Sequence, residues 1–194
     1  MSWATEESGL QLAFSVKCIN FRDRGNGNFQ KNLTNRRSYM LFEAVTLHRR
    51  YPYAVLGGFL LLDKDAKTDG SDRRNSTFYN VHRQLRLFTG RIDPAGRDEQ
   101  YERLYVGLVD AAPTKASATF FVAGEPQSSI ALDEAFDELV GLVAERNPDF
   151  YEAVDGVITP VESAGGKRAR SMSVMSGRCS DTSVPAANLH GEAP

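Results

Sequence analysis

The feature that most constrains the fold is a nearly continuous apolar run of about ten residues, Tyr53 to Leu62, followed by Asp63. A strand with one face in water alternates apolar and polar residues, and this run does not. It therefore predicts a strand buried on both faces, which is typical of parallel or mixed sheets covered by helices. The run is shorter than the roughly 18 residues that a membrane-spanning helix needs.

Two further elements are predicted before this run. Residues 10–19 alternate with period two, as a half-buried strand does. Residues 34–50 carry an apolar stripe at helical spacing, with Thr34 or Asn35 as a suitable N-cap and Pro52 as the stop. Strand, helix and buried strand in this order predict a βαβ unit with a right-handed crossover. The expected fold class is α/β, with a mixed central sheet flanked by helices.

The rest of the chain is predicted to complete the same folded domain and to end in a tail. We predict helices at 77–88 and 132–146, strands at 101–109 and 118–123, and a polar surface loop at 63–76. After Thr159 the composition changes to Ser, Gly, Ala and Pro without periodicity. Residues 1–159 are therefore expected to form one α/β domain, and residues 160–194 a disordered tail.

Charge is unevenly distributed along a chain whose net charge is only -2. Residues 17–50 hold eight Lys or Arg against two acids, whereas residues 98–152 hold twelve acids against three bases. The basic segment indicates an anionic partner or, alternatively, a solvated surface. The first residues do not read as a secretory signal, and the two cysteines lie far apart, so we expect a cytoplasmic protein without a disulfide or a structural zinc.

The candidate chemistry lies in the first fifty residues. Ser15 and Lys17 project from one face of the first strand near its carboxyl end, where α/β sheets gather ligands. A lysine there can stabilise the charge of a phosphodiester under attack, unless it is an ordinary surface lysine. Glu43 lies at the edge of the helical apolar stripe and can reach the neighbouring strand as a Mg²⁺ ligand; the alternative is a surface salt bridge to Arg36 or Arg50.

The segment between strand and helix is rich in basic and amide side chains. Arg and Lys suit phosphate contacts, and Arg and Asn can also read base edges in the major groove. Phe21 and Phe29 are expected to anchor the loop, and His48 to be a buried histidine with its hydrogen bonds satisfied. The predicted DNA contacts are Arg22, Arg24, Lys31, Asn32, Arg36 and Arg37.

The stretches GLQLAFSVKCINFRD and KNLTNRRSYMLFEAVTLHRRYPYAVLGGFLLLD, followed by QYERLYVGLVD and SATFFVAGE, resemble restriction-endonuclease-type proteins of the PD-(D/E)xK nuclease superfamily. The resemblance implies a restriction-endonuclease-like core and a Mg²⁺-dependent endonuclease acting on double-stranded DNA, commonly as a homodimer. Lys17 matches the motif lysine, and Ser15 stands at the motif acid. Glu43 would then be the acid that has moved to the helix, and the backbone carbonyl of Val16 a metal ligand.

The chain departs from the superfamily upstream of this strand. The metal-binding Asp of the superfamily precedes the lysine strand, and here Glu6 and Glu7 are the only acids before it. The resemblance therefore implies a core lacking its N-terminal part. Three functions stay open: a Mg²⁺-dependent restriction-type endonuclease, a catalytically silent DNA-binding protein, and an α/β domain whose basic loop contacts another protein.

Overall fold

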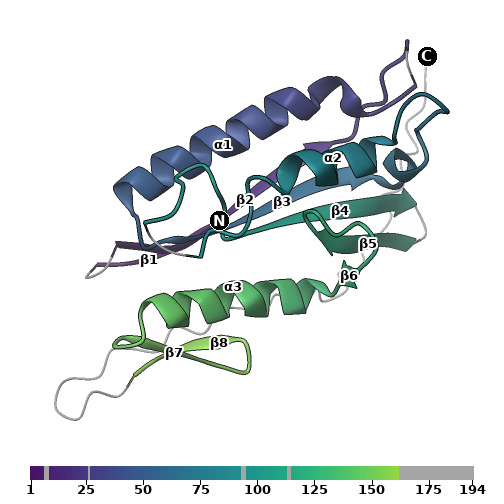
Figure 1. Cartoon of the computed structure of the whole chain (residues 1–194). Coiled ribbons are helices and arrows are strands. Elements are labelled where there is room, and N and C mark those ends of the chain that lie inside the picture. The colour runs from purple at the N-terminus through teal and green to yellow at the C-terminus, as the bar shows by residue number, and fades with distance from the viewer. Residues whose placement is uncertain (7–8, 26, 93–94, 113–114, 162–194) are drawn as a thin grey trace, which may run out of the picture.

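A computed structural model describes residues 1–6, 9–25, 27–92, 95–112 and 115–161. Its centre is a six-stranded mixed sheet with the strand order β1-β2-β3-β4-β5-β6 (Figure 1). The strands are β1 (Ser2–Thr5), β2 (Gly9–Ile19), β3 (Val55–Asp63), β4 (Arg103–Ala112), β5 (Lys115–Val122) and β6 (Ser129–Ile130). β2, β3 and β4 are parallel, and the outer pairings are antiparallel. The predicted α/β class with a mixed sheet is confirmed.

Helices cover both faces of this sheet. α1 (Leu33–Arg50) and α2 (Thr77–Leu85) lie on one face, and α3 (Leu132–Arg146) lies on the other (Figure 1). A small hairpin of β7 (Tyr151–Val154) and β8 (Val157–Pro160) packs beside α3. Two short 3₁₀ helices, Gln30–Asn32 and Lys64–Lys67, stand in the loops that follow β2 and β3.

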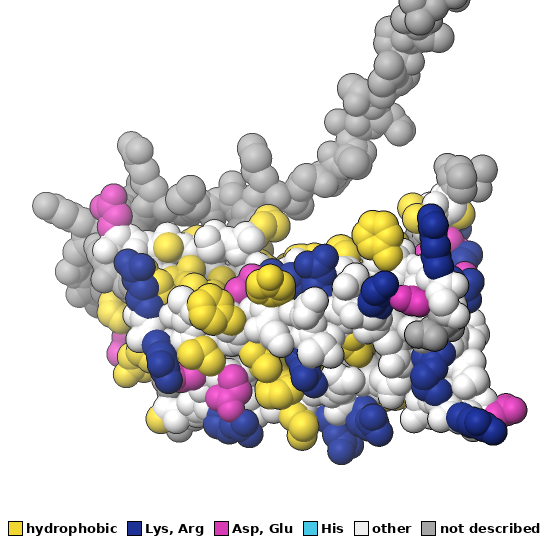
Figure 2. Space-filling view, turned by 90° about the horizontal axis from the view of Figure 1, so that it is seen from above, with side chains coloured by type: hydrophobic (Ala, Val, Ile, Leu, Met, Phe, Trp, Pro, Cys, Tyr) yellow, Lys and Arg dark blue, Asp and Glu magenta, His cyan; other side chains and the backbone are white. Residues whose placement is uncertain are grey.

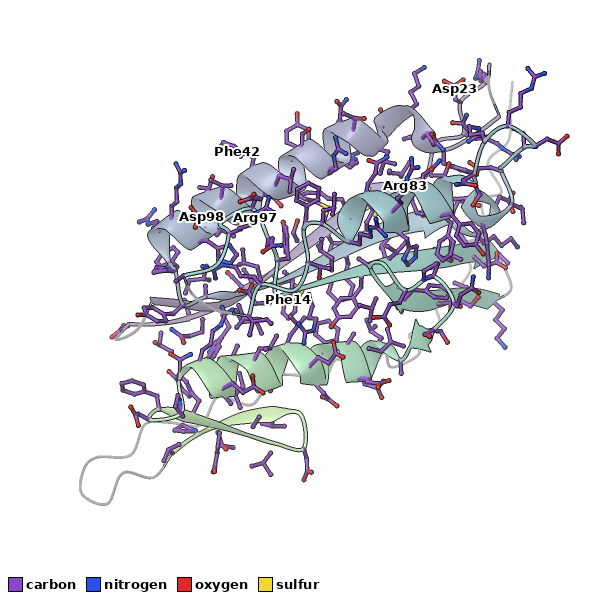
Figure 3. All side chains as sticks on the ribbon, viewed as in Figure 1. Phe14, Asp23, Phe42, Arg83, Arg97 and Asp98 are labelled. Atoms are coloured by element: carbon purple, nitrogen blue, oxygen red, sulfur yellow. The ribbon has the colours of Figure 1, made fainter. Side chains whose placement is uncertain are left out.

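The apolar run at 53–62 forms β3, and its lack of alternation follows from burial on both faces. Leu56, Leu60 and Leu62 pack under α1 and α2, whereas Val55 and Phe59 pack against α3. Figure 3 shows Phe14 of the neighbouring strand β2 pointing toward α3, on the same side of the sheet as Val55 and Phe59. The predicted strand–helix–strand unit is therefore β2–α1–β3, with Lys17 beside Leu60 in the parallel register.

Several boundaries and small elements differ from the sequence predictions. α1 begins at Leu33 rather than after Thr34 or Asn35, because a 3₁₀ turn leads into it, and its N-cap Asn32 makes no side-chain cap bond. β1, β6 and the β7–β8 hairpin were not predicted, because each of these strands is only two to four residues long, too short for a clear period. Pro160 ends β8, and most of the predicted tail, residues 162–194, lies outside the described residues.

The loop at 63–76 also differs from its prediction as a plain surface loop, because it contains a buried carboxylate. Asp69 accepts hydrogen bonds from the backbone N–H of Phe29 at 3.0 Å and of Thr77 at 2.6 Å. The Thr77 hydroxyl donates to it as well, at 2.5 Å. Asp69 thereby joins the loop after β2 to the first turn of α2, where a negative charge also suits the helix dipole.

A buried ionic cluster holds together the end of the sheet where β3 and β4 begin. The carboxylate of Glu102 is fully buried and lies 3.1 Å from Arg91 Nη1, 2.6 Å from Arg146 Nη2 and 3.4 Å from His48 Nε2. It also accepts the backbone N–H of Leu56 at 2.6 Å. Burial alone would raise the pKa of Glu102, but His48, the charge of Arg146 and the Leu56 N–H together lower it. Among the described helices, none is long and apolar enough to cross a membrane.

Candidate functional site

Glu43 of α1 contacts two of the side chains that β2 presents on its α1 face, Ser15 and Lys17. Its Oε1 lies 2.5 Å from Lys17 Nζ, and its Oε2 accepts the Ser15 hydroxyl at 2.5 Å. The alternation of β2 puts Ser15 and Lys17 on the same face, and α1 crosses above them on its way to β3. The three residues proposed from the sequence are therefore brought together, and the salt bridge of Glu43 is to Lys17 rather than to Arg36 or Arg50.

Tyr101, which the sequence reasoning did not include, lies beneath this group. It is buried, and its hydroxyl donates to the backbone carbonyl of Met40 in α1 at 2.9 Å. Burial raises the pKa of Tyr101 above its usual value; the Ser15 hydroxyl opposes this and the nearby charge of Glu43 adds to it. Tyr101 therefore stays neutral, and its hydrogen bond to Met40 holds α1 above the Ser15–Lys17–Glu43 group. No local pattern could reveal it, because it is 84 residues beyond Lys17 in the sequence.

The group lies at a part of β2 whose outer edge has no strand partner among the described residues. β1 pairs only with Gly9 to Ala13, and Met1 adds backbone hydrogen bonds to Phe14. Peptide groups alternate in direction along a strand, so the carbonyls of Val16 and Cys18 point to the same outer side as that of Phe14. Arg36 Nε donates to the Cys18 carbonyl at 3.2 Å, which agrees with this direction. The Val16 carbonyl therefore faces the open edge.

The Glu43 carboxylate and the Val16 carbonyl are oxygen ligands that suit one hard cation whose other ligands are mostly waters. The side chain of Glu43 is 38% exposed and offers two carboxylate oxygens beside the exposed edge of β2. Mg²⁺ commonly takes one or two protein carboxylates, keeps several waters and adds substrate phosphate oxygens. The described residues contain no cluster of three or more His, Cys, Asp or Glu side chains suited to a metal. Glu6 lies exposed in the turn after β1, at the opposite end of β2 from Lys17.

Four of the six predicted DNA-contacting residues, Arg22, Arg24, Lys31 and Asn32, line one hollow at the loop after β2, and Arg36 and Arg37 do not line it. Arg22 donates through Nε to the Gly27 carbonyl at 2.8 Å and lies over the ring of Phe29, which is buried as expected. Lys31 forms an exposed ion pair with Asp23 at 3.2 Å. Arg37 points the other way, toward α2, where it donates to Gln84 at 2.9 Å.

The remaining members of the set stay on the outer surface. Arg24 is exposed in the loop, Asn32 leads into α1, and Arg36 reaches back to the strand edge. Phe21, expected to anchor the loop, is instead 78% exposed. Figure 2 shows the face covered by α1 and α2, where Lys and Arg side chains are spread with apolar side chains among them. A basic outer face is thus present, although Arg37 faces the neighbouring helix.

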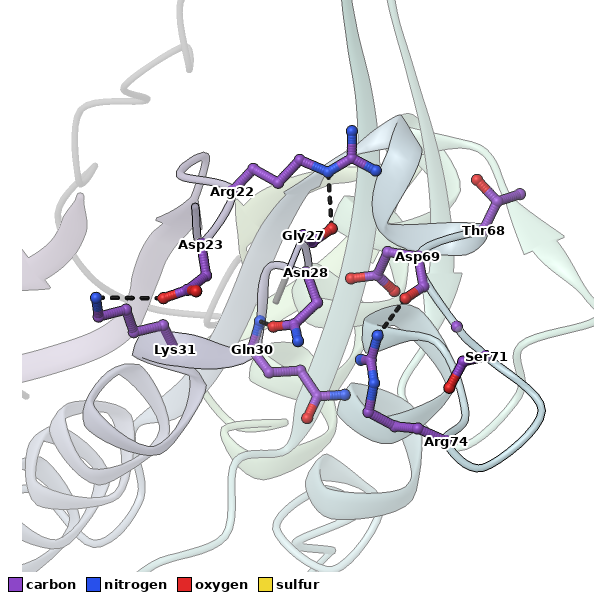
Figure 4. A pocket seen from close by; sticks show the side chains of 11 residues that line it. Arg22, Asp23, Gly27, Asn28, Gln30, Lys31, Thr68, Asp69, Ser71 and Arg74 are labelled. Carbon is purple, nitrogen blue, oxygen red and sulfur yellow. Dashed lines mark hydrogen bonds and ion pairs between the residues drawn. The ribbon is translucent and has the colours of Figure 1, made fainter. Parts of the chain in front are cut away.

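A second loop joins the first at the carboxyl ends of β2 and β3. The loop after β3 places Thr68, Asp69, Ser71 and Arg74 opposite the loop after β2, and a cavity of about 970 Å³ lies between them (Figure 4). No sequence pattern predicts this second loop as a neighbour, because only the fold brings residues 68–74 beside residues 22–31.

Compared with models of known protein families, with curated proteins and with solved structures, the chain shows no match. The function of the chain is therefore inferred from the geometry of its own residues.

Proposed function

We propose that this chain is a Mg²⁺-dependent endonuclease that hydrolyses phosphodiester bonds of double-stranded DNA, with the restriction-endonuclease-like core of the PD-(D/E)xK superfamily. The observation that carries the proposal is the contact of Glu43 with both Ser15 and Lys17. A carboxylate, a lysine and an open backbone carbonyl at one strand end are among the elements that such a reaction uses.

Each of these side chains has a role that follows from its position. The ammonium group of Lys17 stabilises negative charge that develops on the phosphate oxygens. Ser15 donates to Glu43 and so orients the carboxylate toward the strand, while Tyr101 supports the helix above it. Glu43 and the Val16 carbonyl would hold Mg²⁺, which when bound polarises the phosphate and lowers the pKa of a bound water. Arg22, Arg24, Lys31 and Arg36 would contact the DNA backbone.

Incubation of the protein with supercoiled plasmid and Mg²⁺ tests this directly, with the variants Lys17→Met and Glu43→Gln. We expect nicking or linearisation by the wild type and its loss in both variants. Lys64→Met is a matched control, because Lys64 also forms an ion pair at a strand end, with Asp110 at 2.7 Å, but does not contact Glu43 or Ser15. Cleavage that survives in both site variants would exclude the assignment.

A catalytically silent DNA-binding protein is the second candidate. Among the described residues, Glu43 is the only carboxylate that contacts Lys17. Nuclease metal sites often use more than one carboxylate, so this count favours a protein that binds DNA without cutting it. This candidate predicts affinity for DNA that falls steeply with salt and depends on Arg22, Arg24 and Arg36. It also predicts that plasmid stays intact with Mg²⁺ or Mn²⁺.

A further inference from the structure

One side of α1 carries a row of residues that runs from the hollow at the loop after β2 to Glu43. Asn32 lines this hollow and is followed by Arg36, Tyr39 and Glu43 at steps of four, three and four residues. Residues three or four apart are neighbours on a helix surface, so these four form one row, here called the α1 stripe. At a rise of about 1.5 Å per residue, the stripe is about 16 Å long.

Two aromatic side chains are exposed along the hollow and the α1 stripe. Phe21 lines the hollow and is 78% exposed, and Tyr39 is 61% exposed, one turn before Glu43. Single exposed aromatic residues are ordinary on a protein surface. These two, however, lie among cationic side chains, with Arg22 and Arg24 beside Phe21 and Arg36 one turn before Tyr39. Proteins hold single-stranded nucleic acids with this combination, because rings stack on bases and cations attract phosphates.

The charges of the hollow and the stripe favour an anionic ligand. Three cationic residues line the hollow, and its one acid, Asp23, is paired with Lys31 at 3.2 Å. On the stripe, Arg36 is held at the strand edge by its bond to the Cys18 carbonyl, and Glu43 is neutralised by Lys17. Figure 2 shows the same mixture of basic and apolar side chains on the face that α1 and α2 cover.

The exposed rings favour unpaired bases over a closed duplex. Within a duplex, neighbouring base pairs cover both faces of each base, whereas a base of a single strand can turn outward and stack on an aromatic side chain. An anionic membrane is a poorer match. A helix that lies on a membrane buries a broad apolar face, and the α1 stripe holds one ring between polar residues.

We propose that the hollow and the α1 stripe bind a single-stranded segment of DNA, with one base stacked on Phe21 and another on Tyr39. The inference rests on the proposed function in taking the Lys17–Glu43 group as the place of cleavage. It makes the substrate a DNA whose bases are unpaired beside the cut, either a single strand or an opened stretch of a duplex. The binding itself requires neither a metal ion nor cleavage.

The test is fluorescence anisotropy with the full chain in the presence of EDTA, which prevents cleavage. The probes are a labelled single strand, the same strand in a blunt duplex, and a sugar-phosphate strand of equal length without bases. We expect the single strand to bind about tenfold more tightly than either of the others at the same salt concentration, because only the single strand offers free base faces.

Variants of exposed side chains make the assignment specific without disturbing the fold. Phe21→Ala and Tyr39→Ala should each weaken single-strand binding about tenfold and leave duplex binding unchanged. Tyr53→Ala is the matched control, since Tyr53 is also 61% exposed but lies beyond the far end of α1. Tyr39→Trp should retain the affinity and Tyr39→Leu should lose it, because stacking needs an aromatic ring rather than an apolar side chain of any kind.

Equal affinities for the single strand and the base-free strand would overturn the proposal. Equal weakening by Tyr39→Ala and Tyr53→Ala, or full affinity in Tyr39→Leu, would do the same. The nuclease proposal fails separately. Plasmid that stays intact with Mg²⁺, together with single-strand binding that depends on Tyr39, would remove the nuclease and retain this binding surface, and cleavage without such binding would do the reverse.

Discussion

Glu43 and Lys17 form an ion pair at 2.5 Å that joins α1 to β2, and both side chains remain partly in solvent. Exposed or half-exposed pairs contribute about 1 kcal/mol or less to stability. We therefore expect Glu43→Gln and Lys17→Met to change the free energy of unfolding by no more than this amount, as measured by urea denaturation. A role in the reaction would show as lost cleavage in a protein of unchanged stability. Marked destabilisation would instead indicate that the pair serves the fold.

Glu102 should behave in the opposite way, because its partners are buried with it. Glu102→Gln removes the buried negative charge that Arg91 and Arg146 share. Breaking a buried ion pair from one side costs about 3–5 kcal/mol. The midpoint of urea unfolding should fall accordingly. Glu99→Gln is the matched control, since Glu99 pairs with Arg97 at the surface and its loss should be nearly neutral.

The difference between what the sequence predicted and what it missed follows from how local each signal is. β2, α1 and β3 were predicted because their periodicity is contained within each segment, and the edge position of Glu43 on α1 follows from the same wheel. Tyr101, Asp69 and Arg74 were missed because their roles depend on contacts with residues forty or more positions away or on a loop with no period of its own. Glu102 was missed for the same reason, since an acid beside a strand does not show that two arginines and a histidine surround it.

Any side chain at Gly58 of β3 should disturb the packing beneath the Ser15–Lys17–Glu43 group. A Cβ there would meet Met40 Cε at 3.0 Å and Tyr101 Cδ1 at 3.2 Å, and would lie closer still to Leu104. Overpacking of this kind typically costs about 1–3 kcal/mol. Gly58→Ala should therefore lower the melting temperature and move the Tyr101 ring that supports α1. Gly141→Ala in α3 is the control, because its Cβ would meet nothing within 4 Å, and it should be neutral or slightly stabilising.

His82 makes stability depend on pH in a range where few other groups titrate. It is buried against Phe78 and Phe121, and its Nδ1 accepts the backbone N–H of Gly124 at 3.1 Å, so the neutral form fits the site. Burial lowers the pKa of His82 to about 4, against a minor opposing effect of the Val122 backbone.

The sign of the effect follows from proton uptake. Below the ordinary histidine pKa of about 6.5, the unfolded chain binds a proton that the folded chain refuses, so stability falls as the pH decreases from about 6.5 toward 4. The loss should reach roughly 2 kcal/mol at about pH 5. Urea unfolding at a series of pH values measures it, and His82→Asn, which keeps an acceptor for the Gly124 N–H but does not titrate, should flatten the profile. An unchanged profile in this variant would show that another group carries the pH dependence.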